Sequence, residues 1–213
     1  MRLPTRREFV AGPAGRIECA IDAPAGAGSH GSGAARGMAL VAHPHPLHGG
    51  TLDNKVVQTL ARAFAGIGYV AWRANFRGVG DSEGRYDEGR GEVEDLAAVF
   101  LHAHREHGDA PSVLAGFSFG AAMQARLAQR LRKDGCALLP MVLVGIAVNH
   151  VDVPGVPPET LLIHGERDET VPLAAVLDWA RPQDLPVIVV PGADHFFHRR
   201  LHSLRGIVQH FWG

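Results

Sequence analysis

The sequence is poor in cysteine and lacks a long apolar run, and each shortage excludes a class of protein. Its two cysteines, Cys19 and Cys136, are too few for a disulfide framework, so we expect both to be reduced thiols. The apolar run 137–148 is interrupted by a proline and a glycine and is too short to span a membrane. Residues 1–9 lack the apolar core of a signal peptide, so we expect a cytoplasmic location.

An excess of charge of either sign is also missing. The 21 lysines and arginines and 22 aspartates and glutamates are dispersed and give a formal net charge of −1, so neither nucleic acid nor an anionic membrane surface is an expected partner. No phosphate-binding G-x-x-x-x-G-K-[ST] segment occurs, and Gly78–Gly84 has one residue too many for a dinucleotide fingerprint. With 213 residues, 46% of them hydrophobic, the chain predicts a single domain, 1–213.

Apolar segments alternate with helical patterns along most of the chain. Strands are predicted at 15–23 (as an edge strand), 38–42, 69–74, 112–115, 138–147, 160–164 and 186–190. Helices are predicted at 54–65, about 91–104, from 121 onward, about 173–180, and in a last helix that includes His198 and His202 and runs through 211; 24–37 is predicted as a loop. Continuous apolar strands predict an α/β fold, with a mostly parallel sheet covered by helices on both faces. The site is then expected at the carboxyl ends of the strands.

One sharp turn between a strand and a helix carries a serine. Gly116–Gly120 has the pattern G-x-S-x-G, in which the serine sits on a strained turn and the flanking glycines avoid collisions with the backbone. Ser118 is therefore a candidate nucleophile. Gly and Ser are also common in ordinary strand-to-helix loops, so the pattern alone is consistent with either a nucleophile turn or such a loop.

A carboxylate and a histidine follow the serine in the order that such a nucleophile requires. Asp168 comes after the strand 160–164, and His195 comes after the strand 186–190, so both are expected at the edge of the sheet that carries Ser118. Spacing alone leaves Glu166 and Glu169 as alternative acids. His198 is an alternative base, but the loop position after a glycine favours His195.

Several segments together resemble one superfamily. GFSFG, HGERDETVP and GADHFF resemble the nucleophile, acid and histidine segments of the α/β-hydrolases, and NFRGVGDSEG is similar to a further loop of that superfamily. The segment 43–57 resembles the H-P-H-P-x-x-G-G-T-x-x-N-K pattern of small, capless bacterial hydrolases. The resemblance spans about 37–213 and implies an esterase-like serine hydrolase with the triad Ser118, His195 and Asp168. It is also what favours Asp168 over the neighbouring glutamates.

Acyl transfer requires N–H donors for the oxyanion that forms during the reaction. The Phe119 N–H, directly after the serine, is one expected donor. The second is expected from the segment HPHPLHGG, in which the prolines have no N–H, so His45 or Leu47 remains. By position relative to the related hydrolases, His45 is favoured.

The segment 147–160 is too short to form a helical cap, so we expect an exposed site for short or accessible acyl groups. Leu47, Phe196 and Phe197 are predicted pocket walls. Phe117 and Phe119 are further candidates for the walls, although core packing is favoured for Phe117. The expected partner is a small-molecule acyl substrate, and a homodimer is a further expectation. No cofactor is expected.

The histidines also permit a metal-binding interpretation. His43, His45 and His48 have an H-x-H-x-x-H spacing, and His198 and His202 are four residues apart. We expect no metal, because the glycines and prolines favour a shaped loop and exposed histidines are common. An amidase, peptidase or thioesterase with the same triad remains an alternative, as does a non-catalytic binding protein of the same fold.

Overall fold

The computed structural model describes residues 5–24, 35–108 and 110–213, so most of the predicted loop 24–37 lies outside the described residues. Within these ranges, eight strands form one sheet in the order β1-β2-β4-β3-β5-β6-β7-β8. The strands are β1 (Thr5–Gly12), β2 (Gly15–Asp22), β3 (Gly37–Ala42), β4 (Tyr69–Ala74), β5 (Ser112–Phe117), β6 (Met141–Val144), β7 (Leu161–Gly165) and β8 (Val187–Val190). The α-helices are α1 (Lys55–Gly66), α2 (Arg90–His107), α3 (Phe119–Lys133), α4 (Leu173–Ala180) and α5 (Leu201–Trp212).

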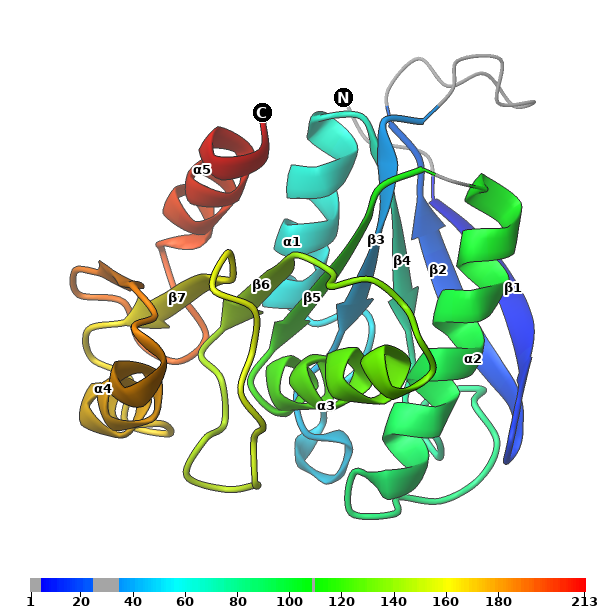
Figure 1. Cartoon of the computed structure of the whole chain (residues 1–213), viewed down its shortest axis with the longest axis horizontal. Coiled ribbons are helices and arrows are strands. Elements are labelled where there is room, and N and C mark those ends of the chain that lie inside the picture. Colours follow the sequence, from blue (N-terminus) through cyan, green and yellow to red (C-terminus); the bar gives the residue numbers. More distant parts are fainter. Residues whose placement is uncertain (1–4, 25–34, 109) are drawn as a thin grey trace.

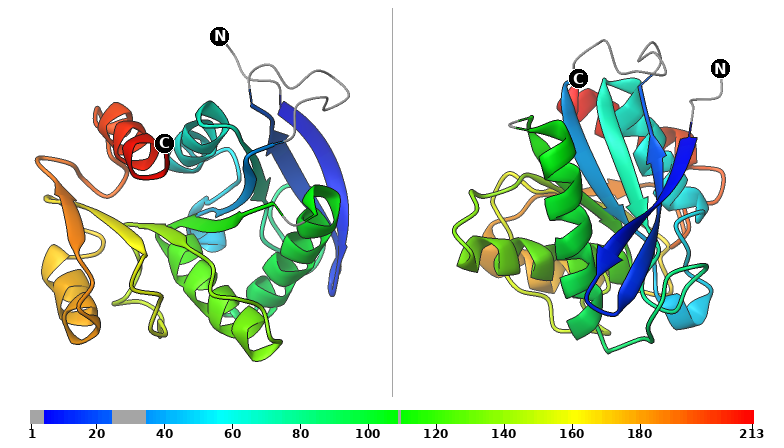
Figure 2. Two further views of the ribbon diagram at one scale, coloured as in Figure 1. Left: turned by 45° about the horizontal axis from the view of Figure 1, so that its top comes forward. Right: turned by 90° about the vertical axis from the view of Figure 1, so that its right-hand side faces the viewer.

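The sheet is mostly parallel and lies between two helical layers. β1 and β2 form an antiparallel hairpin, β2 pairs antiparallel with β4, and all pairings from β4 through β3 to β8 are parallel. Helices α1 and α5 cover one face, while α2, α3 and α4 cover the other (Figures 1 and 2). The predicted α/β class, with its helix-covered, mostly parallel sheet, is confirmed.

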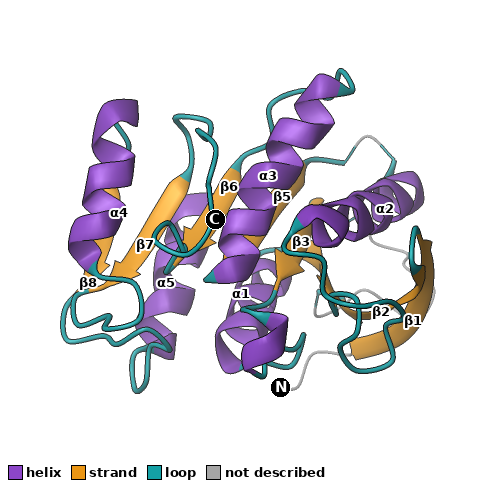
Figure 3. Ribbon diagram, turned by 90° about the horizontal axis from the view of Figure 1, so that it is seen from below, coloured by secondary structure: helices purple, strands orange, loops and turns teal. Residues whose placement is uncertain are grey.

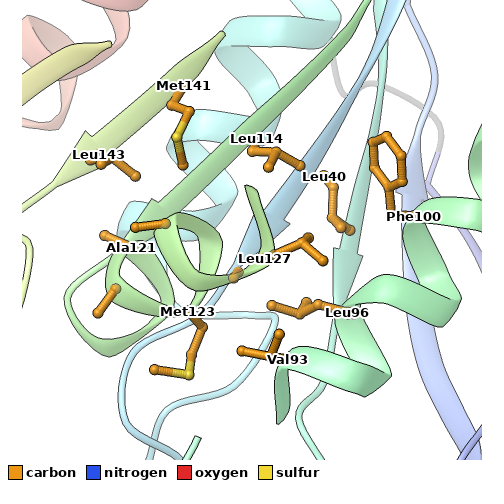
Figure 4. Packing of buried hydrophobic residues seen from close by; sticks show 14 of the residues in the cluster. Leu40, Val93, Leu96, Phe100, Leu114, Ala121, Met123, Leu127, Met141 and Leu143 are labelled. Carbon is orange, nitrogen blue, oxygen red and sulfur yellow. The ribbon is translucent and has the colours of Figure 1, made fainter. Parts of the chain in front are cut away.

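The two layers explain why the central strands are apolar at every position. Leu40 and Leu114 point to the face covered by α2 and α3, where they pack with Leu96 and Leu127 (Figure 4). Val41 is in a separate hydrophobic cluster on the opposite face of the sheet, which α1 and α5 cover. A strand buried on both faces has no position at which a polar side chain could reach water.

Three predicted elements differ from the structure. The strand at 15–23 is not the edge of the sheet, because β1 lies outside it. The segment of β1 is charged and largely exposed, and its Arg7 pairs with Glu18 of β2, so it lacks the apolar pattern of a buried strand. β6 spans only Met141–Val144, with Leu138 exposed before it. Helix α5 begins at Leu201, so the prediction that His198 lies on the last helix is wrong. Among the described residues, none of the helices combines the length and apolarity needed to cross a bilayer.

Candidate active site

Three loops meet where parallel strands end. Ser118 follows β5, Asp168 lies just after β7, and His195 lies in the loop after β8. Since β5, β6, β7 and β8 run parallel and lie side by side, their carboxyl ends share one edge of the sheet (Figure 3). This topology brings together residues that are far apart in the sequence.

The turn that carries Ser118 is strained, and its glycines are required by close packing. Ser118 has φ 56° and ψ −120°, a region that a side-chain-bearing residue rarely adopts. A Cβ atom at Gly116 would lie 2.6 Å from the backbone of Gly120, and one at Gly120 would collide with the carbonyl oxygens of Ala42 and His43. Only glycine at both positions lets helix α3 begin directly against the end of β3.

Ser118, His195 and Asp168 form one hydrogen-bonded chain, which we call the relay. His195 Nε2 lies 3.0 Å from Ser118 Oγ, and His195 Nδ1 lies 2.7 Å from Asp168 Oδ2. The three residues are between 5% and 8% exposed, so water is largely kept from the two hydrogen bonds. A carboxylate, an imidazole and a hydroxyl in this order can move a proton from the serine to the histidine.

The carboxylate of the relay is fixed on both oxygens. Asp168 Oδ1 accepts hydrogen bonds from the N–H groups of Thr170 (3.0 Å) and Val171 (2.8 Å), which leaves Oδ2 for the histidine. His164, a fully buried residue of β7, places Nε2 2.9 Å from the Val171 carbonyl oxygen and 3.5 Å from Asp168 Oδ2. Burial lowers the pKa of His164, so its neutral ring donates to Val171 and steadies the peptide that holds Asp168. Sequence reasoning missed this residue, although a histidine inside an apolar strand was the signal.

The alternative acids and base point elsewhere. Glu166 is exposed and accepts a hydrogen bond from the N–H of Gly192 at 2.7 Å, and Glu169 is exposed to solvent. His198 Nδ1 lies 2.6 Å from Asp194 on the surface, and this bond lowers the pKa of Asp194 despite the opposing effect of partial burial. The structure therefore separates these residues from the relay.

Two of the predicted donors have a backbone N–H group without an acceptor in the described part of the chain. Among the hydrogen bonds of the described residues, the N–H groups of Phe119 and His45 have no partner, whereas the Leu47 N–H donates to His45 Nδ1 at 3.2 Å. The ring of His45 lies 4.8 Å from the ring of Phe119, so the two donors come from adjacent segments. Of the two residues that the sequence left open, His45 is the one with its N–H available.

The loop before this donor is held by His43. The Phe76 N–H donates to His43 Nε2 at 3.0 Å, so Nδ1 must carry the ring proton and donates to the Pro44 carbonyl oxygen at 2.7 Å. His43 is fully buried, and burial lowers its pKa to about 4. Both ring nitrogens are engaged, so His43 has no free ligand atom for a metal shared with His45 and His48.

The three residues predicted to line the pocket differ in their exposure to solvent. Leu47 (66% exposed) and Phe196 (44% exposed) are accessible to solvent, and the ring of Phe196 lies 5.2 Å from the ring of His195. The prediction for Phe197 is wrong, because its side chain is fully buried in the core that includes Leu204 of α5. Phe197 also has a φ of 53°, a conformation that a side-chain-bearing residue rarely adopts.

Phe117 and Phe119 are also buried, and the ring of Phe117 packs 4.8 Å from the ring of His195. The ring of Phe117 therefore packs against the base of the relay, whereas the ring of Phe119 packs against His45, Phe76 and Tyr86. Neither side chain is exposed enough to line an open pocket.

The connection between β6 and β7 does not form a cap. Residues 145–160, all of them described, contain no helix. His150 of this connection lies with Nε2 3.2 Å from the Thr170 carbonyl oxygen, which anchors it to the loop that carries Asp168. The low exposure of Ser118 comes from its immediate neighbours and not from a folded lid.

A parallel sheet between helical layers, with a strained serine at the end of its central strand, defines an α/β serine hydrolase. Residues 45–153, about half of the chain, match the family model described as serine aminopeptidase, S33, and the chain belongs to this family.

Known proteins similar to this chain agree with that assignment. An uncharacterised protein of Rickettsia prowazekii is 32% identical over 196 residues, which cover 87% of this chain and 79% of that protein. A solved structure from Xanthomonas campestris, described as an α/β serine hydrolase without lid, is 33% identical with a TM-score of 0.88, covering 99% of this chain and 94% of that one. An α/β serine hydrolase homologue from Coxiella burnetii is 36% identical with a TM-score of 0.83, covering 98% and 97%. The predicted capless α/β-hydrolase architecture is confirmed.

Proposed function

We propose that this protein is a carboxylesterase-like serine hydrolase that cleaves short or accessible acyl esters through an acyl-enzyme. The observation that carries the proposal is the relay, with 3.0 Å from Ser118 Oγ to His195 Nε2 and 2.7 Å from His195 Nδ1 to Asp168 Oδ2. These are hydrogen-bond distances, as a preorganised nucleophile and base require.

In the first half of the reaction, Ser118 Oγ attacks the ester carbonyl carbon while His195 Nε2 takes the serine proton. Asp168 Oδ2 accepts the hydrogen bond of Nδ1–H and stabilises the imidazolium that forms. The carbonyl oxygen becomes an oxyanion, which the N–H groups of Phe119 and His45 stabilise. The tetrahedral intermediate then collapses, and the imidazolium gives its proton to the departing alkoxide.

In the second half, water replaces the alcohol. His195 takes a proton from the water as its oxygen attacks the acyl carbon, and the resulting intermediate expels Ser118 Oγ, which recovers its proton from the imidazolium. The products are a carboxylic acid and the free enzyme. No other group has to change its charge over the whole cycle.

Two exposed apolar side chains and the lack of a helical cap support an ester substrate with a short or accessible acyl group. Phe196 follows His195 and Leu47 lies two residues after His45, and the connection 145–160 contains no helix. The family description names an aminopeptidase, so amide cleavage by the same relay is the second candidate. An amide needs the same nucleophile and a protonated leaving nitrogen, so only substrate profiling separates the two activities.

The proposal is tested with p-nitrophenyl esters, matched thioesters and aminoacyl p-nitroanilides, assayed with the parent protein and with Ser118→Ala. We expect ester turnover with a burst of p-nitrophenol, a mass increase of one acyl group on the peptide containing Ser118, and neither signal in Ser118→Ala. Ser203→Ala, in helix α5, is the control and should behave as the parent. Turnover that survives in Ser118→Ala would refute the nucleophile. Anilide cleavage faster than ester cleavage would favour the peptidase.

A further inference from the structure

A second concave surface lies beside the segment that carries the oxyanion donor. It is a pocket of about 260 Å³, and Pro46 and Leu47 line it together with Gly78, Gly84, Arg85 and Tyr86. Both glycines have positive φ, 76° and 91°, which lets the loop turn sharply beside this space. We call this space the Arg85 pocket.

Tyr86, which lines the Arg85 pocket, also contacts the segment that carries the proposed oxyanion donor His45. The ring of Tyr86 lies 5.0 Å from the ring of His45 and 6.1 Å from the ring of Phe119. His45 and Phe119 are the two residues whose N–H groups are the proposed oxyanion donors. A substrate held at the serine therefore needs only to extend past the His45 and Tyr86 rings to enter the pocket.

The charges around the Arg85 pocket are unbalanced. Arg77 also lines it, but Arg77 is held by Asp95 through two bonds of 2.7 and 2.8 Å, so its charge is compensated. Arg85 is exposed and has neither an ion pair nor a hydrogen bond with any residue in the described part of the chain. The lining residues include no aspartate or glutamate, so one positive charge remains without a partner.

Tyr86 adds a hydrogen-bond donor to that charge. Burial, and then the charges of Glu92 and Glu88, raise the pKa of Tyr86, so its hydroxyl keeps its proton at neutral pH. Neither carboxylate forms an ion pair with Arg85: Glu92 accepts two backbone N–H groups at 2.8 and 2.9 Å, and Glu88 lies 3.4 Å from Arg90. A guanidinium and a phenol beside an apolar wall form a suitable site for a carboxylate.

We propose that the Arg85 pocket binds a carboxylate of the substrate, so that the preferred substrates are esters that carry a second, ionised carboxyl group. This inference rests on the proposed function, because it assigns a substrate class to the same serine. The carboxylate belongs either to the acyl part, as in a half-ester of a dicarboxylic acid, or to the leaving group. The free positive charge also disfavours the α-ammonium group of an aminopeptidase substrate.

The experiment uses two pairs of substrates, each an ionised carboxylate and its neutral methyl ester, with rates corrected for the uncatalysed hydrolysis of each. On the acyl side, mono-p-nitrophenyl glutarate is compared with its methyl ester. On the leaving-group side, 4-acetoxybenzoate is compared with its methyl ester. We expect kcat/KM to favour the anionic member of one pair, and that pair identifies which side of the ester enters the pocket. The preference should shrink as ionic strength rises, because Arg85 is exposed.

Arg85→Gln assigns the preference to one side chain. An exposed ion pair contributes up to about 1 kcal/mol, so the ratio of anionic to neutral kcat/KM should fall about fivefold, with the neutral ester unchanged. Arg105→Gln, an exposed arginine in the last turn of α2, is the matched control and should keep the parent ratio. Equal rates for both members of each pair in the parent, or an unchanged ratio in Arg85→Gln, would overturn the proposal.

Failure of the proposed function gives a different result, because then neither member of either pair is cleaved. A binding measurement with Ser118→Ala tests the pocket in that case as well. Glutarate should shift the NMR signals of the Arg85 and Tyr86 backbone amides in Ser118→Ala, and the additional Arg85→Gln substitution should weaken this binding about fivefold. Shifts that are absent, or that are unchanged by the Arg85 substitution, would also overturn the inference.

Discussion

The buried His43 makes the stability of this protein depend on pH in a way that can be calculated. His43 is fully buried, accepts the Phe76 N–H and donates to the Pro44 carbonyl, so a second proton would displace the Phe76 bond. Its pKa is lowered from 6.5 to about 4, whereas the unfolded chain has the ordinary value. At a pH between these two pKa values, His43 binds a proton in the unfolded state but not in the folded state.

The direction and the size of the effect follow from this difference. Above pH 6.5 the ring is neutral in both states, and its contribution to stability is fully present. As the pH falls towards 4, protonation of His43 in the unfolded state lowers the free energy of unfolding, by about 2 kcal/mol at pH 5 and about 3 kcal/mol in the limit of low pH. The free energy of unfolding should therefore decrease through this window.

The assay is urea denaturation at pH 8 and pH 5 for the parent protein and for His43→Gln, which keeps an acceptor for the Phe76 N–H but does not titrate. Other groups contribute equally to both proteins, so we expect the parent to lose about 2 kcal/mol more than the variant between the two pH values. Equal losses would refute the reasoning. If the variant does not fold, an NMR titration of the His43 ring decides, and a midpoint near 6.5 would contradict the account.

Three further substitutions test the site and its support. Asp168→Asn should lower kcat for esters by a factor on the order of 10⁴, because the histidine loses the partner that sets its tautomer, while Glu166→Gln should leave kcat unchanged. Gly120→Ala places a Cβ against backbone oxygens and should lower the free energy of unfolding by about 1–3 kcal/mol, whereas Gly206→Ala, with open space around it, should raise it by up to about 1 kcal/mol; thermal melts distinguish these outcomes. His164→Leu removes a donor to the loop that carries the acid and should slow covalent labelling of the serine about tenfold without a matching fall in melting temperature. If labelling slows only together with a matching fall in melting temperature, the role of His164 is structural alone.

The parts of this protein that follow from periodicity and topology could be predicted from the sequence. Strands buried on both faces are apolar at every position, as in β3 and β5, and this predicts a parallel sheet covered by helices. Parallel strands end at one edge, so residues placed just after β5, β7 and β8 were expected to lie together, and the structure brings them together. The order of serine, aspartate and histidine needed no knowledge of side-chain geometry.

The remainder depends on contacts between distant segments. β1 was missed because its charged residues are stabilised by partners elsewhere, such as Glu106 of α2 for Arg6, and not by a local pattern. Phe196 and Phe197 are neighbours of the same type, and only packing against distant segments such as α5 decides which one is buried. Tyr86 stands in a loop without a motif, so its position beside the His45 ring could not be read from the sequence. The expected homodimer stays a prediction.

The most direct test of the central claim is covalent labelling with a fluorophosphonate, followed by mass spectrometry to locate the adduct. The reagent reports an activated serine without any knowledge of the substrate, because its reaction needs only a nucleophile, a base and an oxyanion site. We predict one adduct on Ser118, no labelling of Ser118→Ala, and strongly reduced labelling of Asp168→Asn. A folded protein that takes up no label, or takes it up at another residue, would contradict the account.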